Sequence, residues 1–207
     1  MAIVKRSYRS PRRQAQAEST RRDIAAAARR LFVAQGYGAA TIQAIAREAG
    51  VAVQTVYAAF GTKRAILFAL LDQMVADADL SRLEEDTRVA EGDPRRQLRA
   101  RVAFASRLYA GAGDLIRVAQ AAAAVEPDLA AMVHEGESRR RRAVAGVVRA
   151  WQRDGALADG VDEREAVDLV WALLGPDVFR LFVTDRGWSR RRLEQWQFDT
   201  LERQLFG

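Results

Sequence analysis

Residues 41–63 read TIQAIAREAGVAVQTVYAAFGTK and contain two short helical patterns separated by a glycine. Apolar side chains recur at helical spacing and predict a first helix with one apolar face: Ile42, Ile45, Ala46 and Ala49. Gly50 can adopt the left-handed backbone of a sharp helix end, and a second helical pattern covers residues 51–60. This arrangement predicts a helix-turn-helix, whose second helix can enter the DNA major groove. The same pattern also fits a helical hairpin that does not bind DNA.

The net charge of +6 is distributed unevenly along the 207 residues. Residues 1–64 contain twelve Lys or Arg and three acids, which gives +9. Residues 65–207 contain 21 basic and 24 acidic residues, which gives −3. A basic segment followed by a mildly acidic one predicts that the first part binds a polyanion and the second does not. The alternative is a solvated basic surface without a partner.

The segment 24–67, IAAAARRLFVAQGYGAATIQAIAREAGVAVQTVYAAFGTKRAIL, resembles the DNA-binding domain of the TetR family of bacterial transcriptional regulators. The resemblance is carried by Leu31-Phe32, Gly36-Tyr37, Thr41, Ile45-Ala46, Ala49-Gly50-Val51, Thr55, Tyr57, Phe60 and Lys63. The remainder of the chain matches the family only in length, helicity and order of parts. The resemblance implies a sequence-specific transcriptional regulator, a repressor that a small-molecule effector releases from a palindromic operator.

Seven residues of the helix-turn-helix are candidates for DNA contact: Thr41, Gln43, Val53, Gln54, Thr55, Tyr57 and Lys63. The two glutamine amides can pair with adenine, while the hydroxyls and the lysine suit phosphate oxygens. Two positions depart from the family pattern. Ala52 stands where a Ser-like helix cap is usual, and Ala58-Ala59 stand where relatives carry a larger aromatic residue or His. Base readout is therefore expected to rest on few side chains.

The expected fold is all-α, with an N-terminal three-helix DNA-binding domain and a larger helical domain for effector binding and dimerisation. Residues 1–17 are basic without an apolar period, which predicts a flexible arm that either contacts DNA or stays solvated. Residues 18–64 form the DNA-binding domain, which begins with a helix to residue 35 and has Thr41 as the cap of the next helix. Residues 65–207 form the second domain, joined to the first by a helix over residues 63–78.

Within the second domain, residues 83–93 are expected to form a loop or frayed end because they are charged and end in Gly-Asp-Pro. Helices are expected over residues 94–109, 114–125, 127–155, 162–182 with a kink at Gly175-Pro176, and from Ser189 onwards. The run Arg139–Arg142 points in four directions on a helix, so it is expected to form a solvated face rather than a second DNA site.

The two C-terminal helices have broad apolar faces, which predicts an interface at Val170, Leu174, Val178, Leu181, Leu193, Trp196 and Leu201. In TetR-like proteins the last two helices pack with their copies as a four-helix bundle, which implies a homodimer. The resemblance also implies a cavity for a small apolar or amphipathic effector. Its aromatic candidates are Phe104, Tyr109, Trp151 and Trp171, which could equally be plain core.

Catalytic chemistry is not expected, and neither a cofactor nor a metal is implied. The chain has no cysteine and a single histidine, His134, and it lacks phosphate-binding glycine motifs. An apolar run long enough to span a membrane and a signal peptide are also missing, so we expect a cytoplasmic protein without a membrane partner. Two alternatives stay open: a DNA-binding architectural protein that needs no effector, or a helical binding protein whose basic arm targets RNA or membrane.

Overall fold

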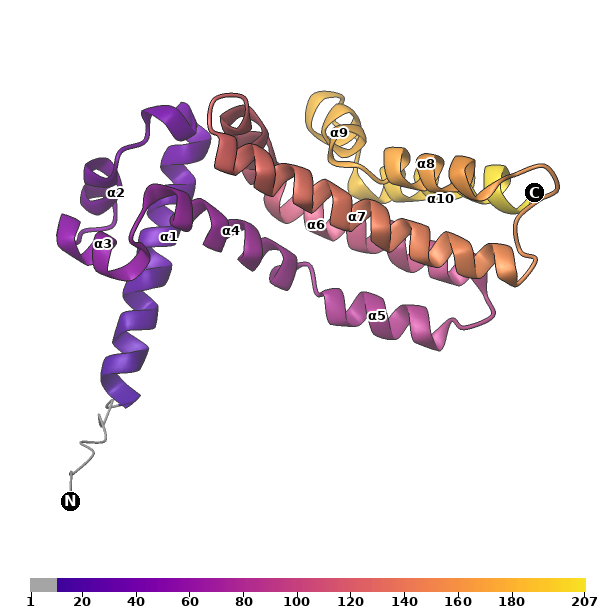
Figure 1. Cartoon of the computed structure of the whole chain (residues 1–207), viewed down its shortest axis with the longest axis horizontal. Coiled ribbons are helices and arrows are strands. Elements are labelled where there is room, and N and C mark those ends of the chain that lie inside the picture. Colours follow the sequence, from indigo (N-terminus) through magenta and orange to yellow (C-terminus); the bar gives the residue numbers. More distant parts are fainter. Residues whose placement is uncertain (1–10) are drawn as a thin grey trace, which may run out of the picture. The chain divides into compact units, whose positions relative to one another are not determined.

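The computed structural model describes residues 11–207, and every regular element in this range is helical (Figure 1). The all-α fold is therefore confirmed. No helix among these residues is both long and apolar enough to cross a membrane. The elements, including the π-helix η1, are α1 Pro11–Ala39, α2 Ile42–Glu48, α3 Val53–Phe60, α4 Lys63–Asp77, α5 Leu80–Val89, α6 Pro94–Ala123, α7 Pro127–Arg153, α8 Glu163–Leu173, α9 Pro176–Phe179, η1 Arg180–Asp185 and α10 Arg190–Phe206.

The chain forms two compact units, of which the first ends at Leu70 and the second comprises Leu71–Gly207. The division falls inside α4, whereas the sequence analysis placed it at the start of this helix, between residues 64 and 65. Because α4 is continuous through the division, it is the covalent link between the two units.

The first unit is a three-helix core of α1, α2 and α3, extended by the first turns of α4. Ile24 and Phe32 of α1 are fully buried, as is Ile45 of α2, and Val56 of α3 is almost so. The Thr41 hydroxyl accepts a hydrogen bond from the Ala44 N–H at 3.1 Å, which confirms Thr41 as the cap of α2. Short helices bury too little surface alone, so each depends on the apolar stripe of α1.

The first helix begins earlier than expected. Residues 11–17 are helical, so the expected flexible arm is wrong for this part, while residues 1–10 lie outside the described residues. The physical reason is composition: Pro11 suits a first helical turn, and the Arg, Gln, Ala and Glu residues that follow are good helix formers. The helical geometry is interrupted at Gly36, which has a φ of 81°, as expected for a stop.

The second unit is built around the antiparallel long helices α6 and α7, against which α8 and α10 pack (Figure 1). Its core contains fully buried side chains from all four helices: Leu98 of α6, Val148 of α7, Val170 of α8, and Leu193 and Leu201 of α10. These residues recur at helical spacing along each element, which is the pattern that predicted the helices.

Residues 83–93 do not form the expected loop, because α5 covers most of them. Asp79 caps this helix by accepting from the Arg82 N–H at 3.1 Å, and Leu83 is buried where α5 packs on α6. An ion pair between Arg88 and Glu85 at 2.6 Å adds little because both side chains are exposed. Packing of a few apolar residues of α5 against α6 therefore stabilises this helix, although half of its residues are charged.

A second correction concerns α6, which runs without interruption through Gly111 and Gly113. The sequence analysis ended one helix there and began another. Neither glycine has a positive φ, and Tyr109, Ala112 and Leu115 continue one buried stripe past both of them. Packing along the whole stripe outweighs the modest helix-weakening effect of glycine.

The third correction concerns Gly175-Pro176, where the helix breaks instead of bending. α8 ends at Leu173, and α9 and then the π-helix η1 follow. Carbonyl groups at the end of α8 are satisfied by side chains from other helices, because the Gln197 amide donates to the Leu173 oxygen and the Arg140 guanidinium donates to the Trp171 oxygen, both at 2.7 Å. The break is thus a stabilised part of the fold.

Candidate functional site

The surface of α3 holds the side chains best placed to meet DNA. Gln54 is exposed and Tyr57 has half of its surface accessible, while Val56 on the opposite side is buried in the three-helix core. Residues three apart share a helix face, so Gln54 and Tyr57 form one outward surface. Val53 and Thr55 are half-buried beside it, and Gln43 is exposed on α2.

The two short helices begin differently. Thr41 caps α2 with its hydroxyl, but Ala52 at the start of α3 forms no side-chain cap, as the sequence predicted. The N–H groups of Thr55 and Val56 donate to the Ala52 carbonyl, but the Ala52 side chain offers no acceptor to the N–H groups of Val53 and Gln54. Such groups can donate to a phosphate oxygen.

Arg21 is a residue of this site that sequence reasoning missed. Its guanidinium, on α1, donates to the Ala59 carbonyl near the end of α3 and lies over the Phe60 ring at 4.0 Å. A cation at a helix C-terminus interacts favourably with the helix dipole, so Arg21 fixes the end of α3. Nothing in the local pattern identifies this role, because the two residues are 38 positions apart.

Lys63 does not take the place expected for a phosphate contact. Its ammonium group donates to the carbonyl oxygens of Tyr37 at 2.8 Å and Gly38 at 3.4 Å, and it lies 4.1 Å from the centre of the Tyr37 ring. These carbonyls follow the break at Gly36, where backbone acceptors lack helical partners. In this structure Lys63 therefore holds the end of α1.

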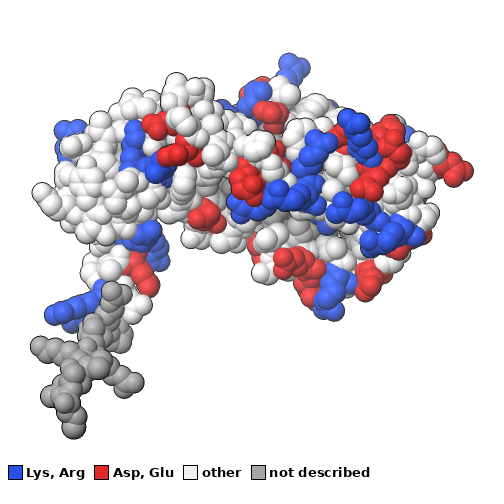
Figure 2. Space-filling model, in the orientation of Figure 1, with Lys and Arg blue, Asp and Glu red and all other residues white. Residues whose placement is uncertain are grey.

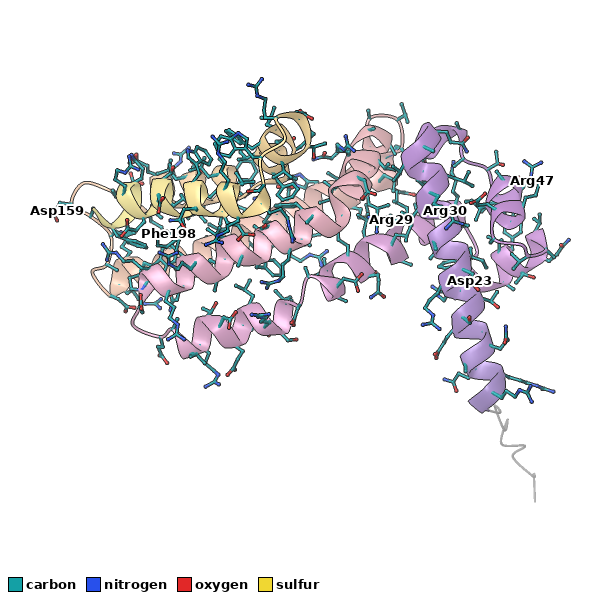
Figure 3. The ribbon with its side chains drawn as sticks, turned by 180° about the vertical axis from the view of Figure 1, so that it is seen from behind. Asp23, Arg29, Arg30, Arg47, Asp159 and Phe198 are labelled. Carbon is teal, nitrogen blue, oxygen red and sulfur yellow. The ribbon has the colours of Figure 1, made fainter. Side chains whose placement is uncertain are left out.

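Arg47, in contrast, is exposed on the last turn of α2 and projects outward (Figure 3). Arg30 of α1 is also exposed, but it forms an ion pair with Glu48 at 2.8 Å, which joins α1 to α2. Arg12 and Arg13 lie on the exposed first turn of α1. Arg12, Arg13 and Arg47 thus supply exposed positive charge on the first unit.

Positive and negative side chains are interspersed on the face of the second unit that Figure 2 shows. The arginine run on α7 illustrates this, because Arg140 pairs with Glu137 at 2.9 Å, Arg141 with Asp168 at 2.6 Å and Arg142 with Glu135 at 2.8 Å. The run is therefore engaged with acids of its own unit and is not a single cationic patch.

The four aromatic pocket candidates occupy different parts of the second unit. Trp151 is 2% exposed, donates to the Gln97 amide oxygen at 2.7 Å and packs edge-on against Phe206. Tyr109 packs against Phe179 instead. Gln97 and Tyr109 are twelve residues apart on α6, roughly 18 Å along its axis, so Trp151 and Tyr109 do not line one small pocket.

The other two candidates are half-buried. Trp171 lies beneath Arg140, whose guanidinium carbon is 4.7 Å from the centre of the Trp171 ring. The indole nitrogen of Trp171 is buried and has no hydrogen-bond partner among the described residues.

Burial raises the pKa of Tyr109 to about 12, so its hydroxyl stays neutral. Phe104 remains a pocket candidate on a less buried face of α6.

Burial corrects four of the seven interface candidates, because the side chains of four residues lie in the core of the second unit itself: Val170, Leu174, Leu193 and Leu201. An apolar helix stripe does not distinguish a core from an interface, which is why the sequence suggested them. Val178 and Trp196 are half-buried, and Leu181 is 47% exposed. The outward face of α8 forms a surface depression lined by Asp162, Arg164, Glu165, Asp168, Leu169, Ala172 and Leu173.

No group of three or more His, Cys, Asp or Glu side chains in the described range is arranged to hold a metal ion. His134 is exposed on α7. The features that stand out for binding are the α3 surface, the buried nitrogens without a hydrogen-bond partner and the face of α8.

The helix-turn-helix segment matches a known protein family. Residues 24–70 match the family described as "Bacterial regulatory proteins, tetR family", a segment that contains α2, α3 and most of α1. No curated protein matches the chain. The match covers the helix-turn-helix with the exposed α3 surface and the Thr41 cap.

Solved structures share the fold of the whole chain. FadR from Bacillus subtilis in complex with stearoyl-CoA is 23% identical with a TM-score of 0.70, covering 87% of this chain and 96% of that one. A regulator from Saccharomonospora viridis in complex with choline is 22% identical with a TM-score of 0.70, covering 92% and 99%.

NalD from Pseudomonas aeruginosa, the secondary repressor of the MexAB-OprM multidrug efflux pump, is 22% identical with a TM-score of 0.71 and covers 92% of this chain and 98% of that one. At these identities the likeness shows a common fold. Residues 24–70 therefore match the TetR family of bacterial regulatory proteins, and the chain as a whole shares the fold of these solved regulators.

Proposed function

We propose that the protein is a homodimeric repressor that binds a palindromic operator and leaves it when a small-molecule effector binds to the second unit. The observation that carries this proposal is the α3 surface, where Gln54 and Tyr57 are exposed while Val56 anchors the helix in the core. A rigid helix with polar outward side chains can read base edges in the major groove.

Dimerisation is supported by the outward face of α8. Leu169 and Leu173 are half-buried and Ala172 is exposed, and acidic and basic side chains surround them. An apolar centre with a polar rim is the common anatomy of a protein interface. Two copies related by a two-fold axis present two recognition helices, which must lie about 34 Å apart to fit successive major grooves.

Release by an effector is supported by the ligands of similar folds, since FadR binds stearoyl-CoA and the S. viridis regulator binds choline. A regulator, and not an enzyme, is the reading that the match of residues 24–70 to bacterial regulatory proteins supports. The natural setting of such a DNA-binding switch is the cytoplasm.

The proposal is tested by selecting binding sites from random duplex DNA with the full-length protein. We expect the selected sequences to contain an inverted repeat whose half-sites are about one helical turn apart. Enrichment of direct or single half-sites would contradict a two-fold dimer, and binding without sequence preference, to RNA or to anionic vesicles as tightly as to DNA, would favour an architectural or surface-binding protein.

A further inference from the structure

One ridge of α6 carries two arginines with a phenylalanine between them. Arg101, Phe104 and Arg107 follow one another at intervals of three residues, so they lie along the same ridge of the helix. All three side chains are half-buried. The ridge therefore combines two cationic groups and an aromatic surface within roughly 9 Å of helix length.

The Arg101 side chain is half-buried, and no carboxylate neutralises its guanidinium. Its Nε atom is shielded from solvent and has no hydrogen-bond partner among residues 11–207. Burial lowers the pKa of Arg101 to about 10, and no carboxylate raises it again. The guanidinium is nevertheless charged at neutral pH, and a buried charge without a counter-charge is unfavourable.

Arg107, six residues further along α6, repeats this situation. Its Nε donates to the Ala78 carbonyl at 3.4 Å, but its Nη2 is buried and has no partner in the described part of the chain. Ala78 directly precedes Asp79, the residue with a φ of 60° that separates α4 from α5. Arg107 thus joins α6 to the junction between these two helices.

We propose that Arg101 and Arg107 bind the oxyanion of an amphipathic effector, a carboxylate or phosphate, whose apolar part lies against Phe104. A guanidinium presents several N–H donors in one plane and matches both oxyanions, which would satisfy the unpaired nitrogens and neutralise the buried charge. A cationic ligand is disfavoured by the same charges. The inference rests on the proposed effector-released repressor and specifies the chemical class of its effector.

Ligand charge is the variable that tests this proposal. Full-length protein is titrated with four probes that share one alkyl chain: decanoate, decyl phosphate, decanol and decyltrimethylammonium, each below its micelle concentration. Isothermal calorimetry and the shift in Tm report binding. We expect at least one anion to bind about ten-fold or more tightly than decanol and the cation to bind most weakly. The two anions distinguish a carboxylate site from a phosphate site.

The variants Arg101→Met and Arg107→Met should remove the preference for the anion over decanol, whereas Arg101→Lys, which keeps the charge, should retain part of it. Arg117→Met is the matched control, because Arg117 is an exposed arginine of the same helix, and it should keep the full preference. If the methionine variants fail to fold, the reduced anion preference of Arg101→Lys tests the proposal in their place.

Equal binding of anions and decanol, binding of neither anion, or an unchanged preference in Arg101→Met would overturn the proposal. Operator affinity is measured in parallel, so that failure of the oxyanion site can be distinguished from failure of the proposed effector-released repression. If an anion binds through Arg101 but leaves the operator affinity unchanged, the oxyanion site stands and release by effector is wrong.

Discussion

Gln43 and Gln54 are exposed amides on the two helices of the DNA-binding motif, and each can form a bidentate contact with adenine. We expect Gln54→Ala and Gln43→Ala each to reduce the preference for operator over random DNA by roughly 1–3 kcal/mol. Competition titrations by fluorescence anisotropy measure this preference. Gln120→Ala, at an exposed glutamine of α6, should change nothing. Full discrimination in both variants would place the readout in DNA shape or in the N-terminal residues.

Lys63 contacts backbone carbonyls of its own unit, so its removal should affect stability before DNA binding. We expect Lys63→Ala to lower the free energy of unfolding by about 1.5–3 kcal/mol, the range for hydrogen bonds to charged groups, as measured by urea titration. Arg47→Ala, at an exposed position on α2, should leave stability unchanged but flatten the salt dependence of DNA affinity. The opposite pair of results would return Lys63 to the phosphate-contacting set.

Arg101 should weaken the free protein at neutral pH. Its pKa is about 10 in the folded state against an ordinary 12.5, so the cost of burying the charge is present below pH 10 and is relieved as the pH rises from 10 to 12.5. We expect Arg101→Met to raise the free energy of unfolding at pH 7 by about 1–3 kcal/mol. Urea titrations should show this gain shrinking at pH 10.5, a value chosen to lie above the folded pKa. A loss of stability in Arg101→Met at pH 7 would mean that the arginine is needed for packing.

At the scale of helices, the sequence predicted best where the signal is local. Thr41, Gly50 and Ala52 mark the boundaries of α2 and α3 through their own cap chemistry, and all three were predicted correctly. The α5 helix was missed because its stability comes from packing of Leu83 on α6, which the sequence does not encode nearby. The role of Arg21 likewise depends on a contact with a distant residue. The apolar stripes of α8 and α10 predicted helices in both segments, but they did not show which apolar residues lie in the core and which lie on the surface.

The continuity of α6 through its glycines can be tested directly. A Cβ added to Gly111 would meet no atom within 4 Å, and Gly111 has no positive φ, so an alanine fits there without strain. We expect Gly111→Ala to raise the free energy of unfolding by about 0.5–1 kcal/mol. Gly36→Ala should instead destabilise by about 1–2 kcal/mol because Gly36 has a φ of 81°. Thermal unfolding of both variants checks this contrast, and destabilisation by Gly111→Ala would indicate that α6 is interrupted at this point.

At the scale of the whole molecule, α4 and the α4–α5 junction connect the two functions of the chain. α4 carries Lys63 and the buried Ile66 and Leu67 in the first unit, and in the second unit the carbonyl of Ala78, the residue after α4, accepts from Arg107. A ligand at Arg107 therefore lies beside the helix that continues into the DNA-binding unit. Transmission requires only that the ligand bind one conformation of this connection better than another.

Such coupling must be reciprocal. If decanoate or decyl phosphate lowers operator affinity by some factor, the operator must lower the affinity for that anion by the same factor, because both changes measure one coupling free energy. We expect the two factors, from anisotropy titrations with anion present and from calorimetry with operator present, to agree within error. In Arg107→Met both factors should approach one, while operator affinity without anion is retained. Unequal factors would show that the anion competes at the DNA surface or unfolds the protein, and a coupling unchanged in Arg107→Met would assign transmission to contacts other than the Ala78 carbonyl.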